Sequence, residues 1–164
     1  MSDLPPPQWW TEVVLLWPLP SAYQRITSPF GLRTHPVTGK SSMHTGIDIA
    51  CPQGTPVWAP CDGVVANVWV DERTGGGLSM TLVTADGRLR FGFAHLSETR
   101  AAKGDCVERG QVIALSGGEP GTEGAGRSTG PHLHLTIRSL MSGALLDPET
   151  LVWVMESEKP EDLP

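Results

Sequence analysis

The sequence has little cysteine, few positive charges and no long apolar run, and each shortage excludes a class of protein. Its 164 residues contain 3 cysteines, with no CxxC pair and no zinc-ribbon spacing. The 12 Lys+Arg are outnumbered by 18 Asp+Glu and form no cluster, so we expect no nucleic-acid partner, which would need a basic footprint. The apolar run Val13 to Trp17 is far short of the roughly 20 residues that cross a bilayer.

The cysteines and the N-terminus leave the cellular compartment open. We expect Cys51, Cys61 and Cys106 to be buried or free thiols; a Cys51–Cys61 disulfide is the alternative if the protein works outside the cytosol. The first residues lack the basic start and small-residue cleavage site of a signal peptide, so the sequence itself predicts no secretory route.

Helical periodicity is also scarce, and short strands take its place. No stretch of ten or more residues carries a helical apolar stripe, although 97–103 could form one or two helical turns. Glycine (19) and proline (15) are scattered between short segments in which apolar residues recur with period two. The pattern predicts an all-β, mainly antiparallel fold. It places strands around 47–50, 64–70, 80–84, 88–95, 112–115 and 133–137, and a turn at 147–149 into a terminal helical or extended segment.

Composition divides the chain into three parts. Residues 1–24 form an arm rich in proline and tryptophan, 25–154 form the main domain, and 155–164 form an acidic tail. Trp9, Trp10 and Trp17 crowd the arm, and a free tail would not expose so much aromatic surface. Either these tryptophans pack onto the domain, or the arm docks on a partner or on wall glycan.

Four of the five histidines suggest a metal site. His44 and Asp48 flank Gly46, and the alternation of apolar residues here favours a strand, on which positions 44, 46 and 48 would share one face. Because four extended residues span roughly 13 Å, either the chain bends at Gly46 or His44 lies in the preceding loop.

A second pair lies near the end of the domain. His132 and His134 point the same way from a strand whose other face is aliphatic. Imidazole and carboxylate are common zinc ligands, and His95, at a strand end, would be a natural proton-transfer group beside such a site. The alternative is a set of unrelated histidines on polar faces.

Several ordered motifs make the sequence resemble the lysostaphin/LytM-type (M23) zinc metallopeptidases, a family of cell-wall endopeptidases. The resemblance covers Ile26 to about Leu151. The motifs are Ser28-Pro29-Phe30-Gly31-Leu32-Arg33-Thr34-His35-Pro36-Val37-Thr38-Gly39, His44-Thr45-Gly46-Ile47-Asp48-Ile49, Gly54-Thr55-Pro56-Val57, Asp62-Gly63-Val64-Val65, His95-Leu96-Ser97 and Ser128-Thr129-Gly130-Pro131-His132-Leu133-His134.

The resemblance implies a role for each site residue. His44, Asp48 and His134 would bind Zn²⁺, and His95 and His132 would act on the attacking water and the transition state. The family often has tyrosine two residues before His95, where this chain has Phe93, so we assign Phe93 no catalytic role. The implied fold has antiparallel sheets that form a groove, of the duplicated-hybrid type.

The resemblance also implies a substrate and a place of action. The substrate would be the peptide part of peptidoglycan, cut in its stem peptides or cross-bridges, so that the protein acts on the cell wall. Because no signal peptide is visible, a bacteriophage lysin or virion-associated protein is one expected origin, and a bacterial enzyme whose export signal was trimmed is the other. The rival functions are a non-catalytic module that activates other wall hydrolases and a structural virion component.

Two glycine-rich stretches complete the expectations. Gly75-Gly76-Gly77 has no following lysine and predicts a mobile loop rather than a phosphate-binding one. The stretch 117–130 contains six glycines directly before His132 and predicts the rim of a substrate groove.

Overall fold

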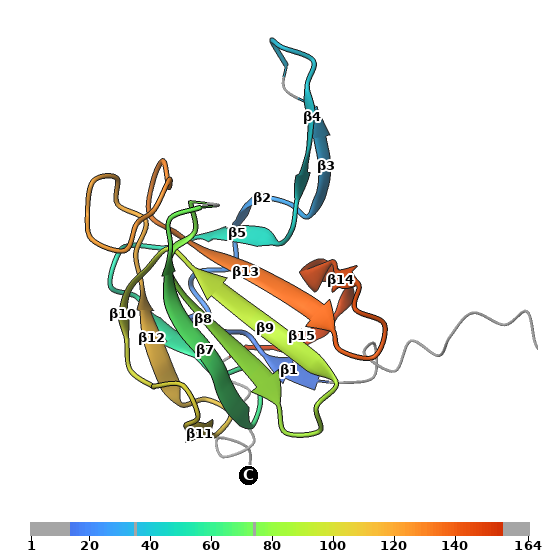
Figure 1. Ribbon diagram of the computed structural model, residues 1–164, viewed down its shortest axis with the longest axis vertical. Coiled ribbons are helices and arrows are strands. Elements are labelled where there is room, and N and C mark those ends of the chain that lie inside the picture. Colours follow the sequence, from blue (N-terminus) through green and yellow to red (C-terminus); the bar gives the residue numbers. More distant parts are fainter. Residues whose placement is uncertain (1–13, 35, 74, 156–164) are drawn as a thin grey trace, which may run out of the picture.

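The computed structural model describes residues 14–34, 36–73 and 75–155, which form a β-structure with one short 3₁₀ helix (Figure 1). The elements in chain order are β1 (Val14–Leu16), β2 (Ile26–Ser28), β3 (Gly31–Thr34), β4 (Ser41–His44), β5 (Ile47–Ala50), β6 (Pro56–Trp58), β7 (Gly63–Asp71), β8 (Gly77–Thr84), β9 (Leu89–Ala94), β10 (Leu96–Thr99), β11 (Cys106–Val107), β12 (Val112–Ser116), β13 (His132–Ser139), β14 (Leu145–Leu146), η2 (Pro148–Thr150) and β15 (Val152–Val154). These described residues contain no helix long and apolar enough to cross a membrane.

The largest sheet runs through the middle of the domain. Its strands lie in the order β11-β7-β8-β9-β13-β5-β2, and β14 pairs with β13. Every neighbouring pair in it is antiparallel. The predicted all-β, mainly antiparallel fold is therefore confirmed; the exception is the parallel pair β1–β15.

Smaller sheets flank this one. Strands β10, β12 and β6 form an antiparallel three-stranded sheet, and β3 and β4 form a two-stranded hairpin that projects from the domain (Figure 1). The hairpin ends at His44, the first of the predicted metal ligands, so it borders the site from one side.

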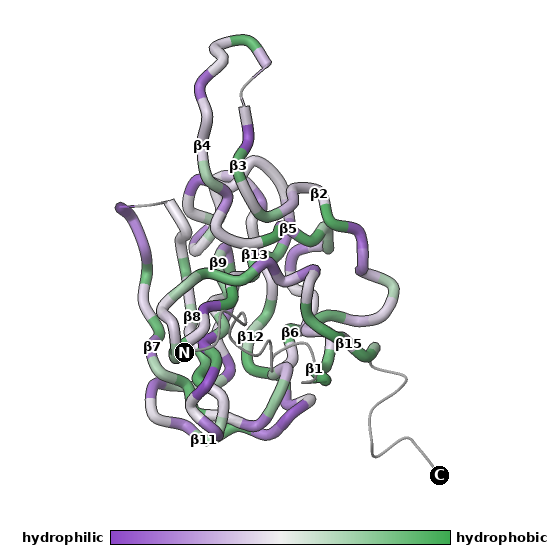
Figure 2. Tube along the Cα trace, turned by 90° about the vertical axis from the view of Figure 1, so that its right-hand side faces the viewer, coloured by the Kyte–Doolittle hydropathy of each residue, from purple (hydrophilic) through white to green (hydrophobic). Residues whose placement is uncertain are grey.

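The core explains why the strands alternate. Along β13 every second residue is buried, and Leu133, Leu135 and Ile137 are 0% exposed. Phe91 and Phe93 of the neighbouring β9 belong to the same core. In Figure 2 the hydrophobic residues, coloured green, recur along the strands. Because side chains of a strand alternate between faces, burying this aliphatic face turns the intervening histidines of β13 to the opposite face.

Part of the predicted arm belongs to this same core. Val14–Leu16 pairs with Val152–Val154, and Leu15 and Leu19 are 0% exposed. The Trp17 indole packs edge-on against Trp153 at 5.4 Å and donates from Nε1 to the Tyr23 carbonyl. Trp17 thus packs onto the domain, as one of the two interpretations expects.

The remaining predictions for the ends of the chain stay predictions. Trp9 and Trp10 lie outside the described residues, as does the acidic tail beyond Met155. The division of the chain at residues 24 and 154 also remains a prediction. The turn at 147–149 is confirmed, because Asp147 caps η2 and the chain continues into β15.

The one or two helical turns predicted for 97–103 are wrong. The first of these residues extend as β10, which pairs antiparallel with β12. The Ser97 hydroxyl donates to the Ser116 carbonyl, and the Arg100 N–H donates to the Ile113 carbonyl. Pairing across the sheet supplies the hydrogen bonds of the backbone N–H and C=O groups, which in a helical turn would have to come from within the segment.

The three cysteines are free thiols, and the alternative disulfide does not form. Cys51 is buried, Cys61 is half-buried and Cys106 is exposed. Burial, assisted by the charges of Asp62 and Asp86, raises the pKa of the Cys61 thiol to about 12. Burial likewise raises the pKa of Cys51.

Thiol labelling tests this arrangement. In the folded protein at pH 8 we expect iodoacetamide to modify Cys106 first, because a thiol of pKa about 12 is thiolate in only about 1 molecule in 10,000. After denaturation without reductant, mass spectrometry should find all three cysteines alkylated. Only one alkylated cysteine would show that the other two are bridged.

Candidate functional site

The centre of the site is set by the register of two strands. In the antiparallel pair β5–β13, Asp48 lies directly opposite His134, and the Asp48 Oδ1 and His134 Nδ1 atoms are 2.8 Å apart. His132 projects from the same face of β13 as His134, as the sequence predicts, and its Nε2 lies 3.6 Å from Asp48 Oδ1. Three side chains thereby converge from two strands.

His44 reaches the same carboxylate from a different element. It is the last residue of β4, the chain bends at Gly46, and its Nε2 lies 3.4 Å from Asp48 Oδ1. Of the two predicted alternatives the bend is therefore confirmed, whereas a single strand with positions 44, 46 and 48 on one face is wrong. A side chain at Gly46 would overlap the Leu135 carbonyl oxygen, so only glycine lets this bend pack against β13.

Backbone carbonyls hold three of the imidazoles by their Nδ1 atoms. The distances are 2.9 Å from His44 Nδ1 to Pro29 O, 2.7 Å from His132 Nδ1 to Gly130 O and 2.7 Å from His95 Nδ1 to Ala125 O. A carbonyl oxygen only accepts, so Nδ1 is the donor in each case and, in the neutral ring, Nε2 keeps its lone pair. The fold thus selects the tautomer that can bind a metal or accept a proton through Nε2.

His95 stands in an unusual backbone conformation. It follows the end of β9 and is, among the described residues, the non-glycine residue with positive φ, at 57°. Its ring lies against that of His132, with centroids 4.8 Å apart. A left-handed conformation costs a non-glycine residue about 1–3 kcal/mol, and the rest of the fold offsets this cost.

Burial and charge set the protonation of two groups. For Asp48, burial raises the pKa, but the hydrogen bond with His134 and the charges of the surrounding histidines outweigh it, so the pKa falls below 3.8. For His95, burial lowers the pKa below 6.5, and the neighbouring His132 lowers it further, against the opposing contact with Ala125. The carboxylate is therefore ionised and the His95 ring is neutral at pH 7.

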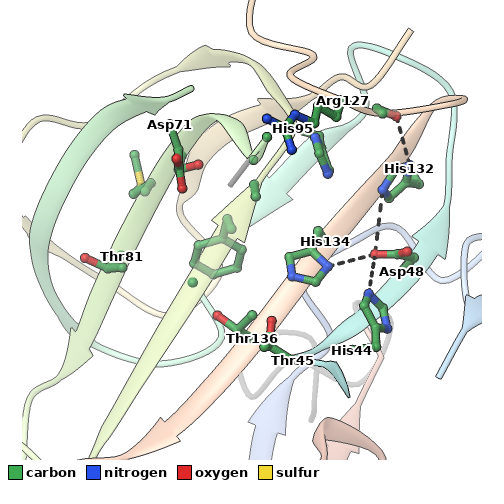
Figure 3. A pocket seen from close by; sticks show the side chains of 18 of the residues that line it. His44, Thr45, Asp48, Asp71, Thr81, His95, Arg127, His132, His134 and Thr136 are labelled. Atoms are coloured by element: carbon green, nitrogen blue, oxygen red, sulfur yellow. Dashed lines mark hydrogen bonds and ion pairs between the residues drawn. The ribbon is translucent and has the colours of Figure 1, made fainter. Parts of the chain in front are cut away.

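All five predicted residues line or contact one groove of about 550 Å³ (Figure 3). The predicted rim is confirmed, because residues 127–129 of the stretch 117–130 line it. Phe93 also lines it, from a position that is 1% exposed. Sequence reasoning missed four polar and aromatic residues of the lining, because no motif singles them out: Trp69, Asp71, Thr81 and Thr136.

The donor set fits a zinc ion. One ligand atom from each of His44, Asp48 and His134 can be chosen so that all three lie within 4.8 Å of one another. Two nitrogens and one carboxylate oxygen are a set that zinc accepts, and three protein ligands leave one position open. The Pro29 carbonyl accepts from His44 Nδ1, and metal-binding histidines are commonly oriented by such a hydrogen bond from the nitrogen that does not bind the metal.

Two glycine-rich loops clamp His95. Its N–H donates to the Gly76 carbonyl at 2.8 Å, and its Nδ1 donates to the Ala125 carbonyl. The loops are joined to each other, because the Arg127 N–H donates to Gly75 at 2.8 Å and the Leu78 N–H donates to Gly124 at 2.9 Å.

The contact between these loops is too close for side chains. A Cβ on Gly126 would overlap the Gly75 carbonyl oxygen, and a Cβ on Gly77 would overlap that of Gly124. The run 75–77, predicted as a mobile loop, is therefore bonded into the site by its own carbonyls.

The clamp can be tested with a matched pair of glycines. Gly126 and Gly121 both have positive φ, at 61° and 82°, but only Gly126 faces another backbone. Gly121→Ala should cost about 1–2 kcal/mol of unfolding free energy from backbone strain alone. Gly126→Ala should cost more and should shift the ring resonances of His95 in ¹⁵N-histidine-labelled protein. Equal losses, with an unmoved His95 signal in both variants, would refute the clamp.

The chain is similar in sequence to known peptidases. The chain is 43% identical over 119 residues to the DD-carboxypeptidase/endopeptidase Mpg of Neisseria meningitidis, which covers 73% of this chain and 25% of the relative. It is 38% identical over 122 residues to the peptidoglycan DD-endopeptidase ShyB of Vibrio cholerae, covering 74% of this chain and 26% of that protein. The chain thus spans about a quarter of the length of these relatives.

Its fold is also that of a solved structure. A zinc-containing peptidase from Vibrio cholerae superposes with a TM-score of 0.69 at 36% identity, over 80% of this chain and 37% of that one. The sequence profile of Peptidase family M23 matches residues 42–148, which include both histidine motifs and His95. The chain belongs to peptidase family M23.

Proposed function

We propose that this protein is a zinc-dependent endopeptidase that hydrolyses amide bonds in the peptide part of peptidoglycan. The observation that carries the proposal is the convergence of three metal-binding side chains and two further imidazoles in one open groove. The relatives named DD-endopeptidases support a wall peptide as the substrate. Action at the cell wall is part of this proposal, and phage-type release remains a prediction.

His44, Asp48 and His134 are the proposed ligands. A zinc ion held by these three residues would supply a Lewis acid for the hydrolysis. Asp48 contributes a negative charge and stays ionised, while the contact from His44 to Pro29 holds that ring in place. The direct 2.8 Å contact between Asp48 and His134 supports this assignment, because it places two of the proposed ligands side by side.

His95 and His132 carry the proton transfers in this proposal. Each has its Nδ1 bonded to a carbonyl, so each presents an Nε2 lone pair. One neutral ring accepts the proton of the attacking water, and the resulting imidazolium stabilises negative charge on the scissile carbonyl oxygen or returns the proton to the leaving amine. The described groove lining contains no glutamate, so no carboxylate of that kind competes for this role.

The metal site has a direct test. Elemental analysis of the purified protein should find one zinc per chain. Asp48→Asn and His44→Ala should weaken zinc binding by more than about 100-fold, because the first removes the negative charge of a ligand and the second removes a ligand. Glu149→Gln, at an exposed position outside the groove, is the control and should keep its zinc. Full zinc retention by Asp48→Asn would show that the ligand set is wrong.

Measurements of hydrolysis distinguish the proposed enzyme from the two rival functions, an activator of other hydrolases and a structural component. On purified cell walls, His132→Ala and His95→Ala should each lower kcat by about 10²- to 10⁴-fold while the chain stays folded and keeps its zinc, because they remove proton transfer and not the metal. A chelator should abolish wall clearing. Wall binding without clearing would instead indicate an activator of other hydrolases, and a chelator-dependent drop in Tm without any lytic activity would indicate a structural zinc site.

A further inference from the structure

The end of the groove beside His95 carries two opposite charges that the proposed reaction does not use. Asp71, the last residue of β7, and Arg127, in the loop before β13, both line the groove. Figure 3 shows both side chains at the His95 end, away from His44. They lie 56 positions apart in the sequence, and both are attached to the run Gly75–Gly77.

Asp71 is held in a defined orientation. It pairs with Gly77 across β7–β8, and its Oδ1 accepts the Arg73 N–H at 3.1 Å. Its Oδ2 would lie 3.6 Å from a Cβ on Gly76, the residue whose carbonyl accepts the His95 N–H. Gly76 therefore links the Asp71 carboxylate to the backbone of His95, a proposed catalytic residue.

The stem of Arg127, an exposed residue, packs against Gly75. Its N–H donates to Gly75, and its side-chain carbons pack where Gly75 has no side chain, 2.5–2.9 Å from the position that a Cβ would take. Within the part of the chain that the structure describes, the Arg127 guanidinium has no hydrogen bond or ion pair. A guanidinium with a packed stem and uncommitted donors is suited to bind a carboxylate in a bidentate manner.

A carboxylate and a guanidinium at one end of a groove are complementary to an amino-acid head, in which an ammonium and a carboxylate share one carbon. Trp69 lies two residues before Asp71 on β7 and lines the same groove, where its ring offers an apolar surface for an aliphatic stem. Wall peptides differ in this respect. Those with a diamino-dicarboxylic residue whose second amine is not part of a cross-link present such a head, whereas glycine cross-bridges carry neither charge.

We propose that Asp71 and Arg127 form a subsite that recognises the free amino-acid head of a diamino-dicarboxylic residue in the wall peptide. This inference rests on the proposed function, because it names which peptides that activity selects. Arg127 binds the carboxylate and Asp71 binds the ammonium. The two residues are specificity determinants and take no part in the proton transfers.

The test uses three cross-linked peptide dimers that differ only at this head. The head is free in the first, has an amidated carboxylate in the second and has an acetylated amine in the third. For the wild-type chain, each modification should lower kcat/KM by about 10- to 100-fold, as expected for one lost charge-assisted contact. The loss should appear mainly in KM, because the head is not the reacting group.

Two variants should separate the two contacts. Arg127→Met should cleave the free and amidated substrates equally but still reject the acetylated one. Asp71→Asn, which keeps the acceptor for the Arg73 N–H, should show the reverse. Glu72→Gln and Arg73→Met change the charge of neighbouring residues that do not line this groove, and both should keep the wild-type preferences. Equal cleavage of all three substrates by the wild type, or unchanged preferences in both subsite variants, would overturn the proposal.

A binding measurement distinguishes failure of the subsite from failure of the enzyme. An uncrosslinked tripeptide with a free head should shift the Arg127 Nε–Hε resonance of the wild-type chain, and its amidated form should not. If this shift occurs without any hydrolysis, the subsite stands and the proposed activity fails. If hydrolysis occurs while Arg127 responds to neither peptide, the subsite fails and the activity stands.

Discussion

The pairing of β5 with β13 is the constraint on which the site depends. It places Asp48 directly across from His134 at hydrogen-bonding distance and puts Leu133 and Leu135 into the core on the other face. A slip of one residue would turn the leucines toward the groove and the histidines into the core, at the cost of buried polar rings and exposed aliphatic surface. The same burial that stabilises the sheet therefore holds the proposed ligands Asp48 and His134 together.

Around this pair, backbone carbonyls and not further charged side chains orient the histidines. Carbonyls of Pro29, Ala125 and Gly130 each accept from the Nδ1 of one histidine. Backbone acceptors have fixed positions and do not titrate, so they select one tautomer over a wide range of pH. Two of these carbonyls lie within the family motifs and that of Ala125 lies just before one, so the backbone in and beside the motifs determines how the histidines are oriented.

Two glycines are needed for the close backbone packing of this site. Gly46 allows the bend that carries His44 back to Asp48, and Gly126 allows two loops to meet behind His95. The same loop contact brings Arg127 to the groove wall next to His95. Catalysis and substrate choice would thus be coupled, because one pair of loops positions a proposed proton carrier and a proposed recognition residue.

Much of the fold could be predicted from local pattern. Period-two alternation at 133–137 predicted a strand with histidines on one face, and β13 confirms it. The helical turns predicted at 97–103 failed because the pairing of β10 with β12, between distant segments, outweighs a weak local preference. For Trp17, its apolar area predicted packing, but its partner Trp153 lies at the other end of the chain.

The same distinction between local pattern and long-range contacts applies to the site. The sequence by itself determined the five residues His44, Asp48, His95, His132 and His134, because their spacing and flanking motifs are local properties of the chain. Only the tertiary structure decided that the rings of His44, His132 and His134 share the Asp48 carboxylate. It also decided that backbone carbonyls select the tautomers of His44, His95 and His132. It alone also placed Asp71 and Arg127 on the wall of one groove, because the proximity of residues far apart in the chain arises from strand register and loop packing, which leave no mark in local spacing.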